Sequence, residues 1–147
     1  MQHLKRSGYR ERLVQLGRCA WDSPNPPALL EEVPATAVEE LEAELAIVYL
    51  LEPDRLEFRV ASGVGLVEGQ TIGTLVPNRP DTAPGYVVAA GLPVTVSDFR
   101  SELRFKPPPA PLNAGLTSGL VVPLSDRGRI LGPLVVCPRT AMRFGNE

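Results

Sequence analysis

The segment that most constrains the fold runs from Gly115 to Val136 and reads GLTSGLVVPLSDRGRILGPLVV. Two apolar runs rich in β-branched residues flank the polar sequence SDRGR, and a polar turn that contains glycine is typical of a β-hairpin. We therefore expect two adjacent antiparallel strands, over residues 120–124 and 130–136. Pro123 and Pro133 each lack a ladder donor, so both should lie at bulges or direct the missing N–H away from a partner. Neither run carries a catalytic type of side chain, which predicts a pocket wall rather than a reaction centre.

The first half of the chain alternates between helical and extended patterns. In residues 28–44 apolar positions recur every three or four residues and glutamates occupy the other side, which predicts an amphipathic helix. Pro34 lies inside it and predicts a kink or a late start. A weaker pattern of the same kind predicts a helix over residues 4–21. Residues 46–51 are apolar throughout, which predicts a central strand covered on both faces.

The rest of the chain predicts shorter elements separated by turns rich in glycine and proline. These elements are a strand at 56–60, a short strand at 70–75, a short helix from Pro84 to a stop at Gly91, and a strand at 93–96. The sequence PPPAP at 107–111 contains a P-x-x-P pattern that is compatible either with docking into an aromatic groove or with a stiff loop.

Charge and hydropathy exclude two classes of partner. The formal net charge is −2, from 15 basic and 17 acidic residues, and no lysine or arginine block is present, which argues against direct binding of nucleic acid. No apolar run approaches the roughly 20 residues needed to cross a bilayer, and the polar, basic N-terminus lacks the apolar core of a signal peptide. We therefore expect a cytoplasmic protein that does not contact a membrane.

The residue types needed for catalysis are poorly represented. The single histidine, His3, precedes the expected folded core, which removes a histidine-based triad, haem ligation and a zinc site from that core. Cys19 and Cys137 are far apart and lack metal-ligand spacing. No serine lies in a G-x-S-x-G elbow. The sequence therefore predicts no enzyme, no catalytic residue and no metal site.

Four side chains of alternating charge surround two phenylalanines after the expected strand at 93–96. They are Asp98, Arg100, Glu102 and Arg104, around Phe99 and Phe105. This arrangement is compatible with a polar ligand site and with a surface charge cluster, and the second reading is the simpler one for each residue alone.

The order of these elements resembles a GAF domain. The resemblance is carried by LLEEVPATAVEEL, AIVYLLEPDRLEFRVASGVG, APGYVVAAGLPVTVSDF, ELRF, the hairpin sequence and a closing RF, and it covers about Leu29 to Phe144. It implies an α+β fold, related to PAS domains, with a central antiparallel sheet of about six strands and helices on both faces. Residues 1–26 would form an N-terminal helix and connection, and residues 27–147 the sensory domain. The chain stops at FGNE, where such a domain would begin its last helix, so we expect a fragment of a longer protein.

The resemblance also implies a function. GAF domains of bacterial multidomain signalling proteins are sensory modules, so we expect a non-catalytic domain that binds a small molecule, mediates dimerisation, or does both. It would control a covalently linked output domain of histidine kinase or diguanylate cyclase type. The ligand is left unknown: haem- and bilin-binding relatives need a histidine or a cysteine that the expected pocket lacks. Cyclic-nucleotide-binding relatives carry an Asn-Lys pair where this chain has Cys137-Pro138, and methionine-sulfoxide-reducing relatives use several pocket cysteines.

Position in the family pattern implies a pocket wall formed by residues 71–105 and the first strand of the hairpin. The candidate ligand-binding residues are Tyr86, Asp98, Phe99, Arg100, Phe105, Thr117 and Ser118. The alternative is a purely structural dimerisation module with no ligand. The amphipathic helix at Leu4 to Ala20 favours it, because an exposed apolar stripe beside a folded domain often pairs with a second copy.

Overall fold

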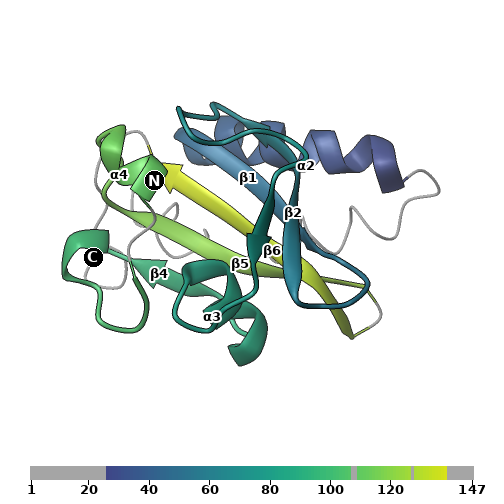
Figure 1. Ribbon diagram of the computed structural model, residues 1–147. Helices are drawn as coiled ribbons and strands as arrows, with labels where there is room; N and C mark the ends of the chain where they lie inside the picture. Colours follow the sequence, from purple (N-terminus) through teal and green to yellow (C-terminus); the bar gives the residue numbers. More distant parts are fainter. Residues whose placement is uncertain (1–25, 107–108, 127, 139–147) are drawn as a thin grey trace.

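A computed structural model describes residues 26–106, 109–126 and 128–138 (Figure 1). The expected helix at 4–21 and the interface expected on it lie outside the described residues. Within the described part, no helix combines the length and the apolarity that crossing a bilayer requires.

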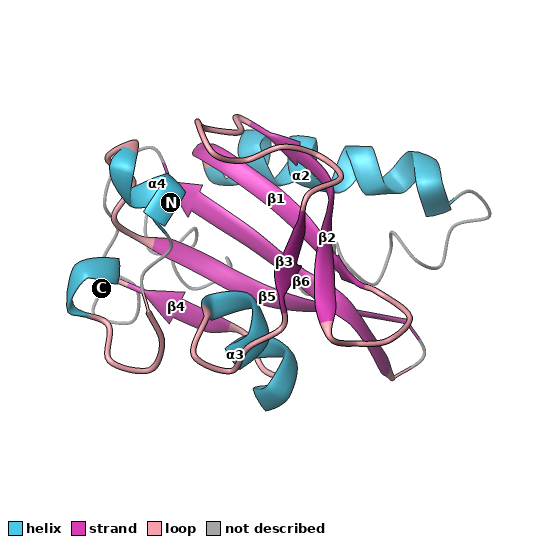
Figure 2. Ribbon diagram, viewed as in Figure 1, coloured by secondary structure: helices cyan, strands magenta, loops and turns pink. Residues whose placement is uncertain are grey.

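Six strands form one antiparallel sheet with the spatial order β3-β2-β1-β6-β5-β4 (Figure 2). The strands are β1 (Ala43–Leu51), β2 (Glu57–Val64), β3 (Leu75–Pro77), β4 (Val94–Val96), β5 (Gly119–Asp126) and β6 (Arg129–Pro138). The helices are α2 (Pro26–Leu41), α3 (Ala83–Ala90), the 3-10 turn η1 (Phe99–Ser101) and α4 (Pro109–Asn113). The expected α+β fold with about six antiparallel strands is confirmed.

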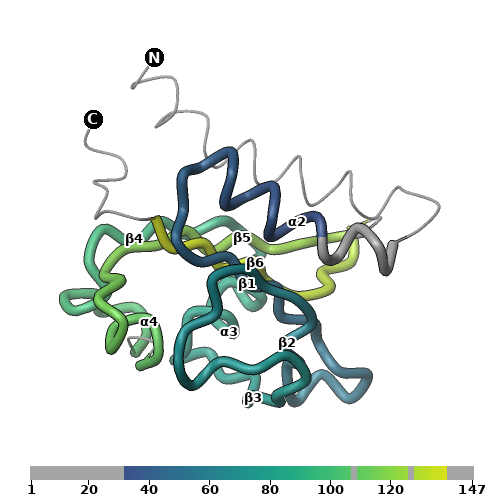
Figure 3. Tube along the Cα trace, turned by 90° about the horizontal axis from the view of Figure 1, so that it is seen from above, coloured from purple at the N-terminus to yellow at the C-terminus, as the bar shows by residue number. Residues whose placement is uncertain are grey.

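Helix α2 covers one face of the sheet, and α3 and α4 lie on the other (Figure 3). Val33, Ala37 and Leu41 are buried on the side of α2 that meets the sheet, at the three- and four-residue spacing that the sequence predicts. They join one apolar cluster with Ala46 and Val48 of β1. The expected amphipathic helix therefore forms one layer of a three-layer domain.

The opposite face of the sheet carries a second apolar cluster. Leu45 and Ile47 of β1 belong to it, while their neighbours Ala46 and Val48 belong to the cluster under α2. Because side chains alternate along a strand, a central strand covered on both faces must be apolar throughout. The expectation for residues 46–51 is confirmed, and β1 begins slightly earlier, at Ala43.

The bounds of α2 differ from those expected at 28–44. The helix begins at Pro26, ends at Leu41 and runs through Pro34, so a late start after this proline is wrong. Glu42 ends the helix because its φ of 52° lies in the left-handed region, and β1 then starts at Ala43. The sequence carries no sign of this stop, since a residue at that position is usually glycine or asparagine.

The hairpin of β5 and β6 is confirmed, and the two prolines lie opposite each other in register. The pairing of β6 with β1 ends at Leu134, just before Pro133 is reached. The pairing of β5 with β4 ends at Val121, two residues before Pro123. A missing ladder donor is best tolerated where the pairing with the neighbouring strand has ended.

Two expectations for the loops need correction. Residues 71–74 form a turn, and the strand expected at 70–75 is instead β3 at Leu75–Pro77. Gly69 and Gly73, with φ of 94° and 95°, keep this segment from extending any earlier. Residues 109–113 of the proline-rich segment form the short helix α4, so they present no polyproline II surface. Prolines are tolerated there because a first helical turn needs no backbone donor.

Helix α3 begins and ends as expected. The Thr82 side chain caps its start by accepting a hydrogen bond from the Gly85 amide at 3.3 Å, and Pro84 lies in the first turn. Gly91 closes the helix in the left-handed conformation with φ of 72°. Strand β4 follows at the edge of the sheet, close to the predicted residues 93–96.

Candidate functional site

The seven candidate ligand-binding residues lie on three segments: helix α3, the stretch that follows β4, and the entry to β5. Their exposures differ. Phe99, Phe105 and Ser118 are buried, Tyr86, Asp98 and Thr117 are partly buried, and Arg100 is exposed.

An aromatic cluster connects these segments. Phe99 is fully buried, and its amide donates a hydrogen bond to the Thr117 carbonyl at 2.6 Å. The rings of Tyr86 and Phe105 lie 5.5 Å apart between their centroids. All three aromatic residues belong to or pack against the apolar cluster on this face of the sheet. Phe99 and Phe105 therefore fill the core here, and only Tyr86 reaches the surface.

Glycine at the start of β5 makes room for this packing. A Cβ at Gly119 would lie 2.9 Å from the Cζ atom of Phe99, which is closer than two carbon atoms normally approach. The ring therefore lies directly against the backbone of β5.

The charged residues pair with each other two positions apart. Asp98 accepts hydrogen bonds from the Arg100 amide and Nε, both at 2.9 Å, and from its Nη2 at 2.8 Å. The Arg100 guanidinium lowers the pKa of Asp98, chiefly through the side-chain hydrogen bonds. The Asp98 side chain also caps η1, which fixes the turn that carries Phe99.

The second pair is more tightly held. Glu102 accepts hydrogen bonds from Arg104 Nε at 2.7 Å and Nη2 at 2.6 Å, and these contacts hold the pKa of Glu102 at about 2. Arg104 Nη2 also donates to the Thr95 carbonyl of β4 at 3.0 Å, and the guanidinium lies 5.7 Å from the centre of the Phe105 ring. Arg104 thus joins the edge of the sheet to the aromatic cluster.

An open hollow of about 390 Å³ lies beside strand β4 and next to these pairs. Its lining is mostly polar and consists of Thr95, Ser97, Asp98, Ser101, Glu102, Leu103 and Arg104. The charge alternation in the sequence therefore corresponds both to exposed ion pairs and to the wall of a polar hollow. Thr95, Ser97 and Ser101 were not anticipated, because single hydroxyl residues in a turn give no distinctive pattern.

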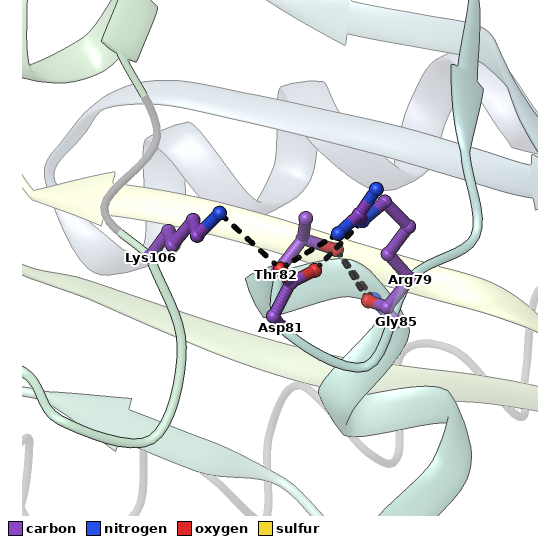
Figure 4. A network of polar contacts seen from close by, with 5 residues as sticks. All are labelled: Arg79, Asp81, Thr82, Gly85 and Lys106. Carbon is purple, nitrogen blue, oxygen red and sulfur yellow. Dashed lines mark hydrogen bonds and ion pairs between the residues drawn. The ribbon is translucent and has the colours of Figure 1, made fainter.

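A further polar network joins the start of α3 to the segment that follows β4 (Figure 4). Arg79 donates to both carboxylate oxygens of Asp81 at 3.0 and 3.1 Å, and Lys106 Nζ lies 3.5 Å from the same carboxylate. The Lys106 amide donates to the Asp81 carbonyl at 2.8 Å, and Lys106 forms a parallel bridge with Thr82. These contacts hold Phe105 against α3. The Thr82 cap has a sequence signature, but the contact with Lys106 depends on tertiary structure alone.

Among the described residues, the single cysteine is poorly placed for nucleophilic chemistry. Cys137 of β6 is fully buried, and burial raises the pKa of its thiol to about 12. The reactive form of cysteine is the thiolate, which is therefore scarce at neutral pH. Within the residues that the structure describes, no group of three histidine, cysteine, aspartate or glutamate side chains could hold a metal ion.

The antiparallel sheet order, with α2 on one face and α3, η1 and α4 on the other, defines an α+β domain of the GAF type. A family model described as GAF domain matches residues 23–147, so the chain belongs to the GAF domain family. Domains of this family commonly have regulatory or sensory roles, and the family fold is also found in enzymes.

Solved structures share this fold. The free methionine-R-sulfoxide reductase of Neisseria meningitidis, in complex with its substrate, is 24% identical with a TM-score of 0.69, over 95% of this chain and 78% of that chain. The GAF domain of a phosphoenolpyruvate-protein phosphotransferase of Coxiella burnetii is 20% identical with a TM-score of 0.70, over 95% and 83%. A Staphylococcus aureus NreA protein mutated in its nitrate binding site is 16% identical with a TM-score of 0.60, over 80% and 90%. No curated protein matches the chain.

Proposed function

We propose that this GAF domain is a non-catalytic sensory domain that binds a small molecule in the hollow at the edge of the sheet beside β4. It would act in the cytoplasm of a bacterium and regulate a covalently linked signalling output domain of histidine kinase or diguanylate cyclase type. The observation that carries the proposal is the polar hollow beside β4, which has a volume of about 390 Å³. Hydroxyl groups, carboxylates and one guanidinium line it, and a few polar groups that face one space can orient a ligand.

The chemistry of this hollow favours binding over conversion. The carboxylates of Asp98 and Glu102 are paired with arginines, and both have lowered pKa values. They are therefore ionised at neutral pH and poor general acids, since an effective acid titrates near the working pH. A ligand with hydroxyl or amino groups would find acceptors in these side chains, and an apolar part would lie against Leu103.

The binding of a ligand here can influence the output only through a difference in affinity between two arrangements of the domain. The segment from Ser97 to Lys106 offers such a difference, because it lines the hollow and also inserts Phe99 and Phe105 into the core. A ligand that shifts this segment would alter the packing under the sheet.

A second candidate is a purely structural dimerisation module with no ligand. The complete burial of Phe99 and the burial of Phe105 support it, because these rings fill the space between the sheet and the covering segments. In that case the hollow would be a surface depression between ion pairs.

Turnover of methionine-R-sulfoxide tests the non-catalytic part of the proposal, because a structural neighbour is a reductase of that compound. We expect the intact chain with excess dithiothreitol to form methionine no faster than a Cys19→Ser, Cys137→Ser variant, since the Cys137 thiol is buried and protonated. Methionine formation can be followed by NMR. Turnover that disappears in the variant would show that the domain is an enzyme.

A further inference from the structure

The Arg104 guanidinium makes three kinds of contact in the wall of the hollow beside β4. Its Nε and Nη2 atoms donate to the two carboxylate oxygens of Glu102, at 2.7 and 2.6 Å. Nη2 also donates to the main-chain carbonyl of Thr95 at 3.0 Å, and the centre of the Phe105 ring lies 5.7 Å from Arg104 Cζ. A carboxylate, a carbonyl oxygen and an aromatic ring are all groups that recognise a guanidinium ion. Together they form a binding site that is filled by a residue of the chain itself.

The neighbouring pair of Asp98 and Arg100 has the same spacing but a different character. Within the described residues, the hydrogen bonds of Arg100 all go to Asp98. The Asp98 side chain is 34% exposed, whereas that of Glu102 is only 10% exposed. Water screens an exposed ion pair and little is gained from it. The Glu102 carboxylate is therefore the acceptor of the two that is better placed to hold a cation.

The acceptor groups of this site do not depend on the Arg104 side chain for their position. The main-chain amide of Arg104 donates to Glu102 Oε2 at 2.9 Å, and this bond persists when the side chain is changed. Thr95 is held in β4 by its register with Leu120 of β5, and Phe105 is buried in the core. Groups that are fixed before binding lose little freedom when a ligand arrives.

The hollow gives an incoming guanidinium access to the same acceptors. Thr95, Glu102 and Arg104 all line it, together with Ser97 and Asp98. A molecule that carries a guanidinium can therefore contact further polar groups that the Arg104 side chain does not use. Arg104 is itself exposed, so its side chain can move into solvent without opening the core.

We propose that Glu102, Thr95 and Phe105 form a guanidinium-binding site, which Arg104 fills as an internal ligand. The small molecule that binds in the hollow carries a guanidinium group and takes the place of the Arg104 side chain. This inference rests on the proposed function and names the chemical class of its ligand. The bond from Arg104 to Thr95 also joins the segment after β4 to the sheet. Its displacement gives the domain two arrangements that differ in ligand affinity.

Titration with agmatine, followed by NMR of the isotope-labelled intact chain, tests the site. Arg104→Ala should bind agmatine about tenfold more tightly than the unmodified chain, because the competing side chain has been removed. Shifts should centre on Thr95, Glu102 and Phe105. If Arg104→Ala does not fold, Arg104→Ser provides the same opening.

Two matched controls separate recognition of the guanidinium from a change in charge. Arg100→Ala removes the same charge from the exposed pair and should leave the affinity for agmatine unchanged. Putrescine carries an ammonium where agmatine carries its guanidinium, and an ammonium lacks the planar fork that matches a carboxylate. Putrescine should therefore bind Arg104→Ala more weakly than agmatine does.

A guanidinium can belong to a free small molecule or to an arginine of a peptide. Agmatine and the peptide acetyl-Gly-Arg-Gly-amide both carry the group, so each is titrated against the unmodified chain. Saturable binding of agmatine supports a free small molecule as the ligand. Binding of the peptide alone would overturn that assignment.

Three results would overturn the guanidinium site itself. They are equal affinity of agmatine for Arg104→Ala and the unmodified chain, an equal gain in Arg100→Ala, and equal binding of putrescine and agmatine to Arg104→Ala. Failure of the proposed function gives a different pattern. In that case agmatine binds Arg104→Ala at Thr95, Glu102 and Phe105, which supports the site, but no small molecule binds the unmodified chain.

Discussion

Replacing Phe99 with alanine should lower the free energy of unfolding by about 3–5 kcal/mol. The ring is fully buried on the α3 side of the sheet and packs against the backbone at Gly119. Its removal takes away apolar contacts and leaves a cavity that the hydrogen bond between the Phe99 amide and the Thr117 carbonyl prevents from collapsing completely. Urea denaturation followed by circular dichroism would measure the loss.

The matched control is Leu103→Ala in the same segment. The Leu103 side chain is 97% exposed, so its truncation should change the stability by less than about 0.5 kcal/mol. If Phe99→Ala does not fold, Phe99→Leu should still fold with a loss of about 1–2 kcal/mol. Equal effects at Phe99 and Leu103 would contradict the burial of Phe99.

Replacing Gly85 with alanine should destabilise the domain by about 2–3 kcal/mol, although alanine is the better helix former. An ideal Cβ at Gly85 would overlap the carbonyl group of Arg79, which is backbone and cannot rotate away. The same Arg79 carbonyl accepts a hydrogen bond from Thr82 Oγ1 at 2.8 Å, so a shift of the loop would disturb the cap of α3 (Figure 4).

The sign of the Gly85→Ala effect is decisive. Without the close approach, alanine in α3 should stabilise the domain by about 1 kcal/mol through helix propensity. Ala89→Gly, at an exposed position of the same helix, calibrates this contribution and should cost about 1 kcal/mol. A stabilising Gly85→Ala in thermal or urea denaturation would show that the loop at Arg79 does not pack on α3.

Much of the fold could be predicted because the spacing of apolar residues along the sequence shows which faces of a helix or strand are buried. The continuous apolar run in β1 and the spacing in α2 both reflect which faces are covered. The end of α2 could not be predicted, because Glu42 adopts a left-handed conformation that its residue type does not favour. The turn at 71–74 was missed because threonine and isoleucine there favour strands, while the glycines around them set the backbone.

The candidate site could be located from the sequence only in part. The family pattern identified the segments that meet on the α3 side, and Asp98, one of the candidates, lines the hollow. The sequence could not separate Phe99 and Phe105, which are buried, from the charged residues between them, because a turn has no fixed side-chain period. Whether the candidate residues bind a ligand is still a prediction.

The central claim, ligand binding in the hollow beside β4, is tested most directly by NMR of the isotope-labelled intact chain. The spectrum would be titrated separately with glucosamine, arginine and methionine-R-sulfoxide, each of which carries hydroxyl or amino groups whose hydrogen bonds Asp98 and Glu102 can accept. We expect saturable shifts with at least one probe, grouped at residues around the hollow and aromatic cluster such as Tyr86, Asp98, Arg104 and Phe105. Shifts with none of these probes, or shifts grouped on α2, would contradict the claim and favour the purely structural module.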